Sequence, residues 1–101
     1  RTNGKVRALR NRFEGTKMRA VGPPNYGIWA LPGANIQFTD NTVTGWRHAI
    51  FADRAKVIAK GNQVAGFPRA AFRLKQPVIG SDVSGNQVPT GGKLQELQID
   101  K

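Results

Sequence analysis

A chain of 101 residues, of which 39% are apolar, is long enough for one domain with a modest core. The absence of cysteine excludes disulfides and thiolate metal sites, and no apolar run approaches the ~18 residues that a membrane span requires. Sixteen Lys and Arg against six Asp and Glu give a net charge of +10, which favours a polyanionic partner. The alternative is a solvated basic surface without a dedicated partner.

The first element along the chain is a turn of the form Asn-x-apolar-x-Gly, which recurs three times, the last time with one extra residue. Asn suits a tight turn because its side chain bonds nearby backbone groups, and Gly supplies backbone freedom. Val6, Ile36 and Val57 stand five positions before the first three Asn residues, whereas Val78 and Ile79 lie further upstream of the fourth. We expect the Asn side chains to stack as a structural ladder. They are Asn11, Asn41, Asn62 and Asn86.

Between these turns lie short segments of alternating apolar and variable residues, at 27–31, 49–53 and 71–75. Ile28, Ile50 and Phe72 occupy equivalent positions 22 residues apart, and alternation of this kind predicts strands with one buried face. A period of about 22 residues with two or three short strands predicts a β-solenoid, in which each strand pairs with its equivalent in the next coil.

The stretch NIQFTDNTVTGWRHAIFAD, followed by KVIAKGNQVAGFPRAAFRLK, resembles the repeat of pectate-lyase-like proteins. The resemblance covers residues 5–92 and implies an all-β, right-handed parallel β-helix of about four coils. We expect one domain over residues 1–101, which could be a C-terminal fragment of a longer solenoid, with a closing strand over 93–99. The superfamily includes polysaccharide lyases, hydrolases, epimerases, viral tailspikes and non-catalytic surface proteins, so the resemblance implies a fold rather than one activity.

One connection between a turn and the next strand is about eight residues longer than the others. This loop excursion spans 16–26 and carries Lys17, Arg19 and Tyr26. Long excursions of solenoids often hold binding groups, which makes these three residues candidates. The alternative is a cap or an idle surface loop.

Two columns of outward side chains combine aromatic and basic residues, as a groove for an anionic polymer would. Aromatic rings stack on sugar rings, and Arg and Lys pair with carboxylate or sulfate groups. The first column holds Trp29, Phe51 and Arg73, with Leu31, Asp53 and Lys75 beside it. The second holds Trp46 and Phe67, with Arg47, His48, Pro68 and Arg69 near by. The alternative is that the aromatics pack against a loop or a neighbouring subunit.

Catalysis on an acidic polysaccharide would be a β-elimination, which needs a cation to neutralise the carboxylate and a base to take the α-proton. His48, Arg73 and Tyr26 are the candidates, although a single turn histidine is often incidental. Pectate lyases bind calcium through clustered Asp residues, whereas the six acids here are dispersed. We therefore predict no metal and no cofactor.

These observations favour a β-helix module that binds or processes an acidic polysaccharide, as a lyase or epimerase would. A second hypothesis is a structural or adhesion module, such as a tailspike, that is oligomeric through its outward aromatics. A third is nucleic-acid binding by charge alone, supported by Lys5, Arg7, Arg10, Arg12 and Arg19. No signal peptide is evident, and we expect a secreted, periplasmic or virion-surface location. A longer parent chain or a homo-oligomer is also expected.

Overall fold

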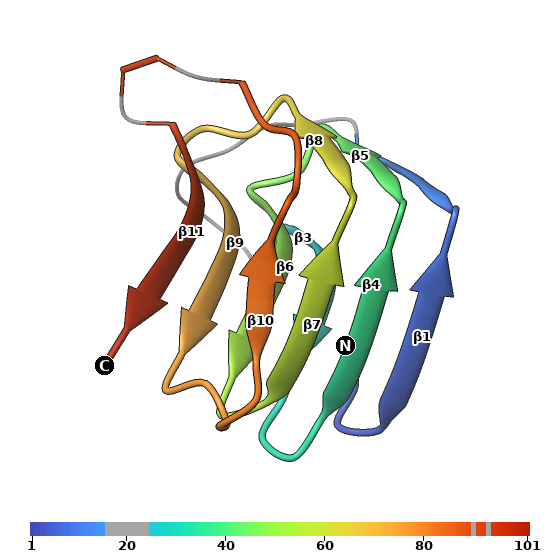
Figure 1. Cartoon of the computed structure of the whole chain (residues 1–101), viewed down its shortest axis with the longest axis vertical. Coiled ribbons are helices and arrows are strands. Elements are labelled where there is room, and N and C mark those ends of the chain that lie inside the picture. Colours follow the sequence, from blue (N-terminus) through green and yellow to red (C-terminus); the bar gives the residue numbers. More distant parts are fainter. Residues whose placement is uncertain (16–24, 90, 93) are drawn as a thin grey trace.

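The computed structural model describes residues 1–15, 25–89, 91–92 and 94–101, which contain eleven strands and no helix. Every strand pairing is parallel and joins equivalent strands of successive coils. In Figure 1 the chain rises along the near sheet, crosses the top and descends along the far sheet while it advances from β1 towards β10, which is a right-handed path. The molecule is therefore an all-β parallel β-solenoid, as the repeat predicts. None of the described elements is a helix long and apolar enough to cross a membrane.

Three sheets form the walls of the solenoid. The first contains β1 (Lys5–Leu9), β4 (Asn35–Thr39), β7 (Lys56–Lys60) and β10 (Asp82–Ser84). The second contains β3 (Tyr26–Ala30), β6 (His48–Asp53), β9 (Ala70–Lys75) and β11 (Gln95–Asp100). The third contains β2 (Arg12–Glu14), β5 (Thr42–Thr44) and β8 (Gln63–Ala65).

Three coils are complete, because each contributes one strand to every sheet. A fourth coil is partial: β10 and β11 extend two sheets, and a single bridge between Gln63 and Gln87 takes the place of a third strand. The expected number of about four coils is thus corrected to three complete coils and a partial fourth. The closing strand expected over 93–99 is β11, which pairs in parallel with β9 and begins at Gln95.

The core fills the space between the sheets with rows of like residues. Val6, Ile36 and Val57 stand in one register, and Ile28, Ile50 and Phe72 in another, as their spacing predicts. The phenyl rings of Phe38 and Phe72 meet edge to face, with their centroids 6.3 Å apart. Close packing of this kind supplies most of the free energy that stabilises a small domain.

The fourth coil departs from the spacing of 21 residues that separates Ile36 from Val57 and Val57 from Val78, which would place Val78 in register with them. Val78 is 45% exposed and Ile79 is 96% exposed, so neither enters the core. Val83 lies opposite Ala59 and is the buried residue among those described in that coil. The shift arises because the turn before β10 is longer than the sequence pattern suggests. The hydroxyl of Ser81 accepts a hydrogen bond of 3.1 Å from the backbone of Val57, which places Ser81 beside Val57.

The Asn residues form a continuous ladder of hydrogen bonds at one corner of the solenoid. The side-chain oxygen of Asn41 accepts the backbone N–H of Asn11 at 2.7 Å, and that of Asn62 accepts the backbone N–H of Asn41 at 2.8 Å. The side-chain amide of Asn62 in turn donates to the carbonyl of Phe38 at 2.9 Å. These contacts satisfy backbone groups that the corner would otherwise bury without partners.

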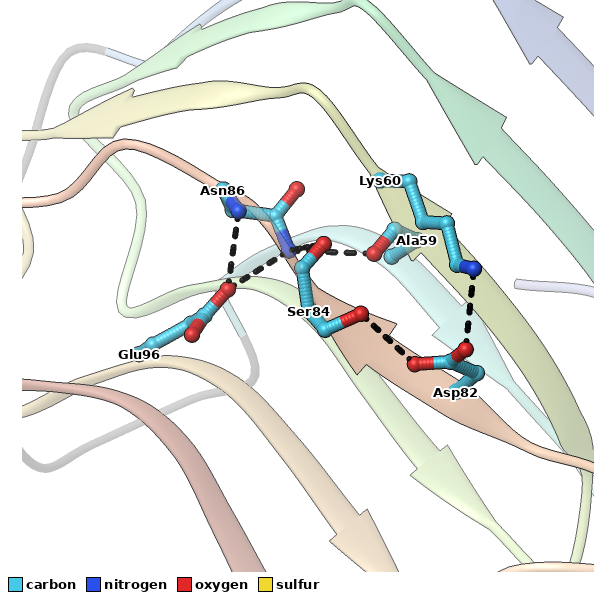
Figure 2. Close-up of polar contacts among 6 residues, drawn as sticks. All are labelled: Ala59, Lys60, Asp82, Ser84, Asn86 and Glu96. Carbon is cyan, nitrogen blue, oxygen red and sulfur yellow. Dashed lines mark hydrogen bonds and ion pairs between the residues drawn. The ribbon is translucent and has the colours of Figure 1, made fainter.

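The ladder ends at a carboxylate, as Figure 2 shows. Asn86 donates to Glu96 from its backbone N–H at 3.0 Å and from its side-chain amide at 2.9 Å. Glu96 lies in β11, so this contact joins the last strand to the corner of the last coil. At the opposite end no described residue bonds the side chain of Asn11, which is exposed.

The residue before each ladder Asn adopts a left-handed backbone conformation. Arg10 has a φ of 54° and Asp40 a φ of 55°, and glycine stands at the equivalent places, with φ of 71° at Gly61 and 67° at Gly85. This conformation turns the chain sharply between two strands, and glycine adopts it at little cost. The corner is therefore set by two residues, the left-handed one and the Asn after it.

Gly15 and Gly45 hold two coils together at a neighbouring corner. A Cβ atom built on Gly15 would collide with the carbonyl oxygen of Gly45, and one built on Gly45 would collide with that of Gly15. Gly45 also has a φ of 82°. The fifth residue of the recurring turn is therefore glycine for two reasons, close approach between coils and backbone conformation.

Candidate functional site

An aromatic cluster covers the outer surface of the sheet formed by β3, β6 and β9. Trp29 and Phe51 are register partners, which places one ring a coil above the other. Tyr26 joins them: its ring stacks on Phe51 with centroids 5.0 Å apart and meets Trp29 edge-on at 5.8 Å. All three side chains are half-buried. Short stacked strands thus bring together residues from separate coils.

Three arginines lie over these three rings. The guanidinium of Arg1 is 5.0 Å from the ring centroid of Trp29, that of Arg73 is 5.4 Å from Phe51, and that of Arg47 is 5.8 Å from Tyr26. Each distance is within the range of a cation–π interaction. We call this group the aromatic–arginine face; its members are Tyr26, Trp29, Phe51, Arg1, Arg47 and Arg73.

The backbone explains why Arg1 reaches this face. Thr2 donates its N–H to the carbonyl of Trp29 at 2.9 Å and accepts the N–H of Leu31 at 2.8 Å. The N-terminal residues therefore run alongside β3 as an additional short bridge. Arg1, next to Thr2, is held over the neighbouring tryptophan.

Arg73 is also part of an ion pair. Its Nε lies 2.7 Å from a carboxylate oxygen of Asp100 on β11, and both side chains keep partial solvent exposure. Burial raises the pKa of Asp100, but the hydrogen bonds from Arg73 and Gln98 outweigh burial, so the pKa is lowered overall. Asp100 is thus ionised near neutral pH and fixes the guanidinium against the ring.

His48 lies beneath the aromatic–arginine face and is only 4% exposed. Its Nδ1 lies 2.8 Å from the carbonyl oxygen of Ala70, and because a carbonyl can only accept, Nδ1 carries the proton. Burial lowers the pKa of His48; the hydrogen bond to Ala70 opposes this, and the nearby Arg73 and Arg47 lower the pKa further. The imidazole is therefore neutral near pH 7, stacked against Tyr26 with centroids 5.7 Å apart.

One surface thus holds the three catalytic candidates, His48, Arg73 and Tyr26, but each of them is packed against or bonded to other side chains of the protein. His48 is enclosed, and Arg73 is engaged by Asp100 and Phe51. Tyr26 begins strand β3, which corrects its assignment to the loop excursion. A neutral imidazole with an unprotonated Nε2 has the chemistry of a general base, but only 4% of the surface of His48 is exposed, which limits its contact with a substrate.

The remaining candidates are distributed more widely. Lys75 is exposed at the end of the column and pairs in register with Asp53 and Asp100. Arg69 is exposed just before β9. Lys17 and Arg19 lie outside the described residues.

The second predicted column does not form an open aromatic surface. Phe67 is 4% exposed and belongs to the core, which corrects its placement among outward residues. Trp46 is half-buried against the core, and its indole N–H is buried with no acceptor among the described residues. Both aromatic side chains therefore pack against the core and offer no open surface.

Sequence reasoning missed a shallow pocket on the sheet of β1 and β4. Its volume is about 300 Å³, and Lys5, Val6, Arg7, Asn35 and Gln37 line it. Lys5 and Arg7 alternate with the half-buried Val6, and Asn35 and Gln37 alternate with the buried Ile36, so the alternation itself marks these four as outward. Their convergence depends on the register of Lys5 with Asn35, which follows from the alignment of Val6 with Ile36.

A second shallow pocket lies on the sheet of β5 and β8. It measures about 350 Å³ and is lined mainly by Thr and Gln side chains together with Val64, Val88 and Pro89. It carries hydroxyl and amide groups but no charge. Within the described part of the chain, no group of three or more His, Cys, Asp or Glu side chains could hold a metal ion.

Comparison with known proteins identifies no relative of this chain. No family model matches the sequence, and neither the curated proteins nor the solved structures yield a match. The parallel β-solenoid therefore rests on the strand pairing of the chain itself.

Proposed function

We propose that this chain is a β-solenoid module that binds an acidic polysaccharide through the aromatic–arginine face, and that its repeat is of the pectate-lyase-like kind. The single observation that carries the proposal is that three arginines lie over three aromatic rings on one sheet surface. A guanidinium presents a planar fork of donors that matches a carboxylate. The three arginines lie over three different rings, so they offer a polymer more than one point of contact.

Binding without turnover is the form of the proposal that the geometry favours. A lyase needs its base at the α-proton of the bound sugar, whereas His48 is only 4% exposed and packs against the rings of Tyr26 and Phe51. We therefore expect no rise in ultraviolet absorbance from unsaturated uronates when the protein is mixed with polygalacturonate or alginate. Such polymers are found outside cells, and we propose an extracellular or virion-surface location for the module.

The test compares two variants that remove the same charge. Arg73→Gln removes a guanidinium of the aromatic–arginine face, and Arg12→Gln removes an ion-paired guanidinium from the sheet of β2 and β5. Isothermal titration with oligogalacturonate should show about tenfold weaker binding for Arg73→Gln, since a charge-assisted contact contributes about 1.5 kcal/mol. Arg12→Gln should bind nearly as well as the unchanged protein.

Two results would count against the proposal. Equal losses in the two variants would mean that net charge alone attracts the polymer. Tighter binding to duplex DNA than to oligogalacturonate would favour a nucleic-acid partner. The two affinities have to be compared at the same salt concentration, because counterion release makes binding to DNA fall steeply as salt rises.

A further inference from the structure

The pocket lies on the sheet of β1 and β4. That sheet and the sheet of β3, β6 and β9, which carries the aromatic–arginine face, form opposite walls of the solenoid (Figure 1). The register of β1 and β4 determines the shape of the pocket. Lys5 pairs with Asn35 and Arg7 pairs with Gln37, so two cations on one strand face two amides on the next. We call these four residues the cation–amide pocket.

Among the described residues, no carboxylate forms an ion pair with the cations of this pocket. The ion pairs of the described residues join Arg12 to Glu14, Arg54 to Asp53, Lys60 to Asp82 and Arg73 to Asp100. None involves Lys5 or Arg7, and Lys56, the register partner of Asn35, adds a third cation on the same surface. The acid of this sheet, Asp82, lies on β10 and is engaged by Lys60, as Figure 2 shows. The positive potential is therefore concentrated at the β1 end of the sheet.

We propose that the cation–amide pocket is a second binding site, and that it takes one uronate residue of an acidic polysaccharide. Lys5 and Arg7 would pair with the carboxylate. Asn35 and Gln37 each offer both donors and acceptors, which is what the hydroxyl groups of a sugar ring require. The volume of about 300 Å³ lies at the lower end of pockets that hold small ligands, which fits one ring rather than several.

A second site on the opposite wall makes the module bivalent. This consequence rests on the proposed function, because it needs the aromatic–arginine face to hold another polymer strand. The core between the two walls prevents one strand from contacting both sites over a short path. Two strands bound on opposite walls would be linked, and such links raise the overall avidity of a polymer network.

The two sites can be tested separately by titrating the 15N-labelled protein with sodium galacturonate and following backbone amide shifts. Galacturonate should shift the amides of 5–7 and 35–37, with a dissociation constant on the order of 10 mM, as expected for one charged sugar. Uncharged galactose should shift them far less. Arg7→Gln should weaken binding at this site about fivefold or more, and Arg12→Gln should leave it unchanged, since Arg12 belongs to another sheet.

The inference is overturned if galacturonate produces no saturable shifts at 5–7 and 35–37, if galactose produces the same shifts, or if Arg7→Gln binds there as well as the unchanged protein. Shifts at 26–29, 51 and 73 report on the aromatic–arginine face and therefore on the proposed function. Either set can respond without the other, so failure of one proposal is distinguishable from failure of the other.

Bivalency has its own readout. Light scattering of long polygalacturonate should rise when the unchanged protein is added and should rise much less with Arg7→Gln, although that variant still binds through the aromatic–arginine face. Equal scattering from both proteins would show that the cation–amide pocket links no strands.

Discussion

At the scale of single residues, the corner of the solenoid depends on buried amides. Asn62 is fully buried and accepts from Asn41 while donating to Phe38 and to the next Asn of the ladder. Its role follows from the sequence, since Asn recurs in a fixed relation to an apolar residue and a glycine. The left-handed conformation of Arg10 could not be predicted from its residue type, whereas Asp40 belongs to a type enriched in that conformation and glycine stands at the equivalent positions 61 and 85.

Replacing Asn62 by alanine should destabilise the protein by about 3 kcal/mol. The buried N–H of Asn41 and the carbonyl of Phe38 would lose their partners, and each unsatisfied group costs about 1–3 kcal/mol. Asn11→Ala is the matched control, because the side chain of Asn11 is exposed at the end of the ladder, and it should cost less than about 1 kcal/mol. Urea unfolding measures both values, and equal losses would refute the ladder as a source of stability.

His48 should make stability depend on pH in a definite window. Burial lowers its pKa in the folded state below the ordinary value of 6.5, so the unfolded chain takes up a proton more readily. The free energy of unfolding should therefore fall as the pH drops below about 6.5, by at most about 1.4 kcal/mol per pH unit for one proton. Asp53 and Asp100 also stabilise the folded state, because their pKa values are lowered on folding. Their contributions to the free energy of unfolding are lost only at more acidic pH, below the ordinary pKa of 3.8.

Urea unfolding at several pH values between 7.5 and 5 checks this dependence. His48→Gln keeps a donor for the carbonyl of Ala70 but does not titrate, so its stability should be nearly constant over that range. A slope that persists unchanged in His48→Gln would assign the effect to another group.

At the scale of strands, alternation predicted the segments that became β3, β6 and β9, together with their mutual register. It worked because inward Ile and Phe recur at constant spacing wherever the connections have similar lengths. It failed before β10, where a longer turn moves Val78 and Ile79 into solvent. Spacing alone cannot distinguish an apolar residue in a turn from one in a strand, since both satisfy the same periodicity.

The corrected register of the fourth coil leads to a paired prediction. Val83→Ala should destabilise the protein by about 1–2 kcal/mol, because it removes two buried methyl groups beside Ala59. Ile79→Ala removes a larger side chain that is 96% exposed and should change stability by less than about 0.5 kcal/mol. Thermal or urea denaturation of the two variants decides between the two registers. A larger loss of stability in Ile79→Ala than in Val83→Ala would favour the register expected from spacing.

At the scale of the whole molecule, the solenoid distributes its excess positive charge over separate walls. The net charge of +10 predicted a polyanionic partner but not where it would bind. The aromatic–arginine face was partly predictable, because Trp29, Phe51 and Arg73 are outward residues of aligned strands. The contributions of Arg1 and Asp100 were not, because they depend on how the two ends of the chain lie against β3 and β9.

The most direct test of polysaccharide binding at the aromatic–arginine face is the tryptophan fluorescence of two single-tryptophan variants. In Trp46→Phe the remaining Trp29 lies on that face, and in Trp29→Phe the remaining Trp46 is packed against the core. We predict that oligogalacturonate changes the emission of Trp29 saturably, with the affinity found by calorimetry, and leaves that of Trp46 unaltered. Saturable binding accompanied by no change at Trp29 would contradict this assignment.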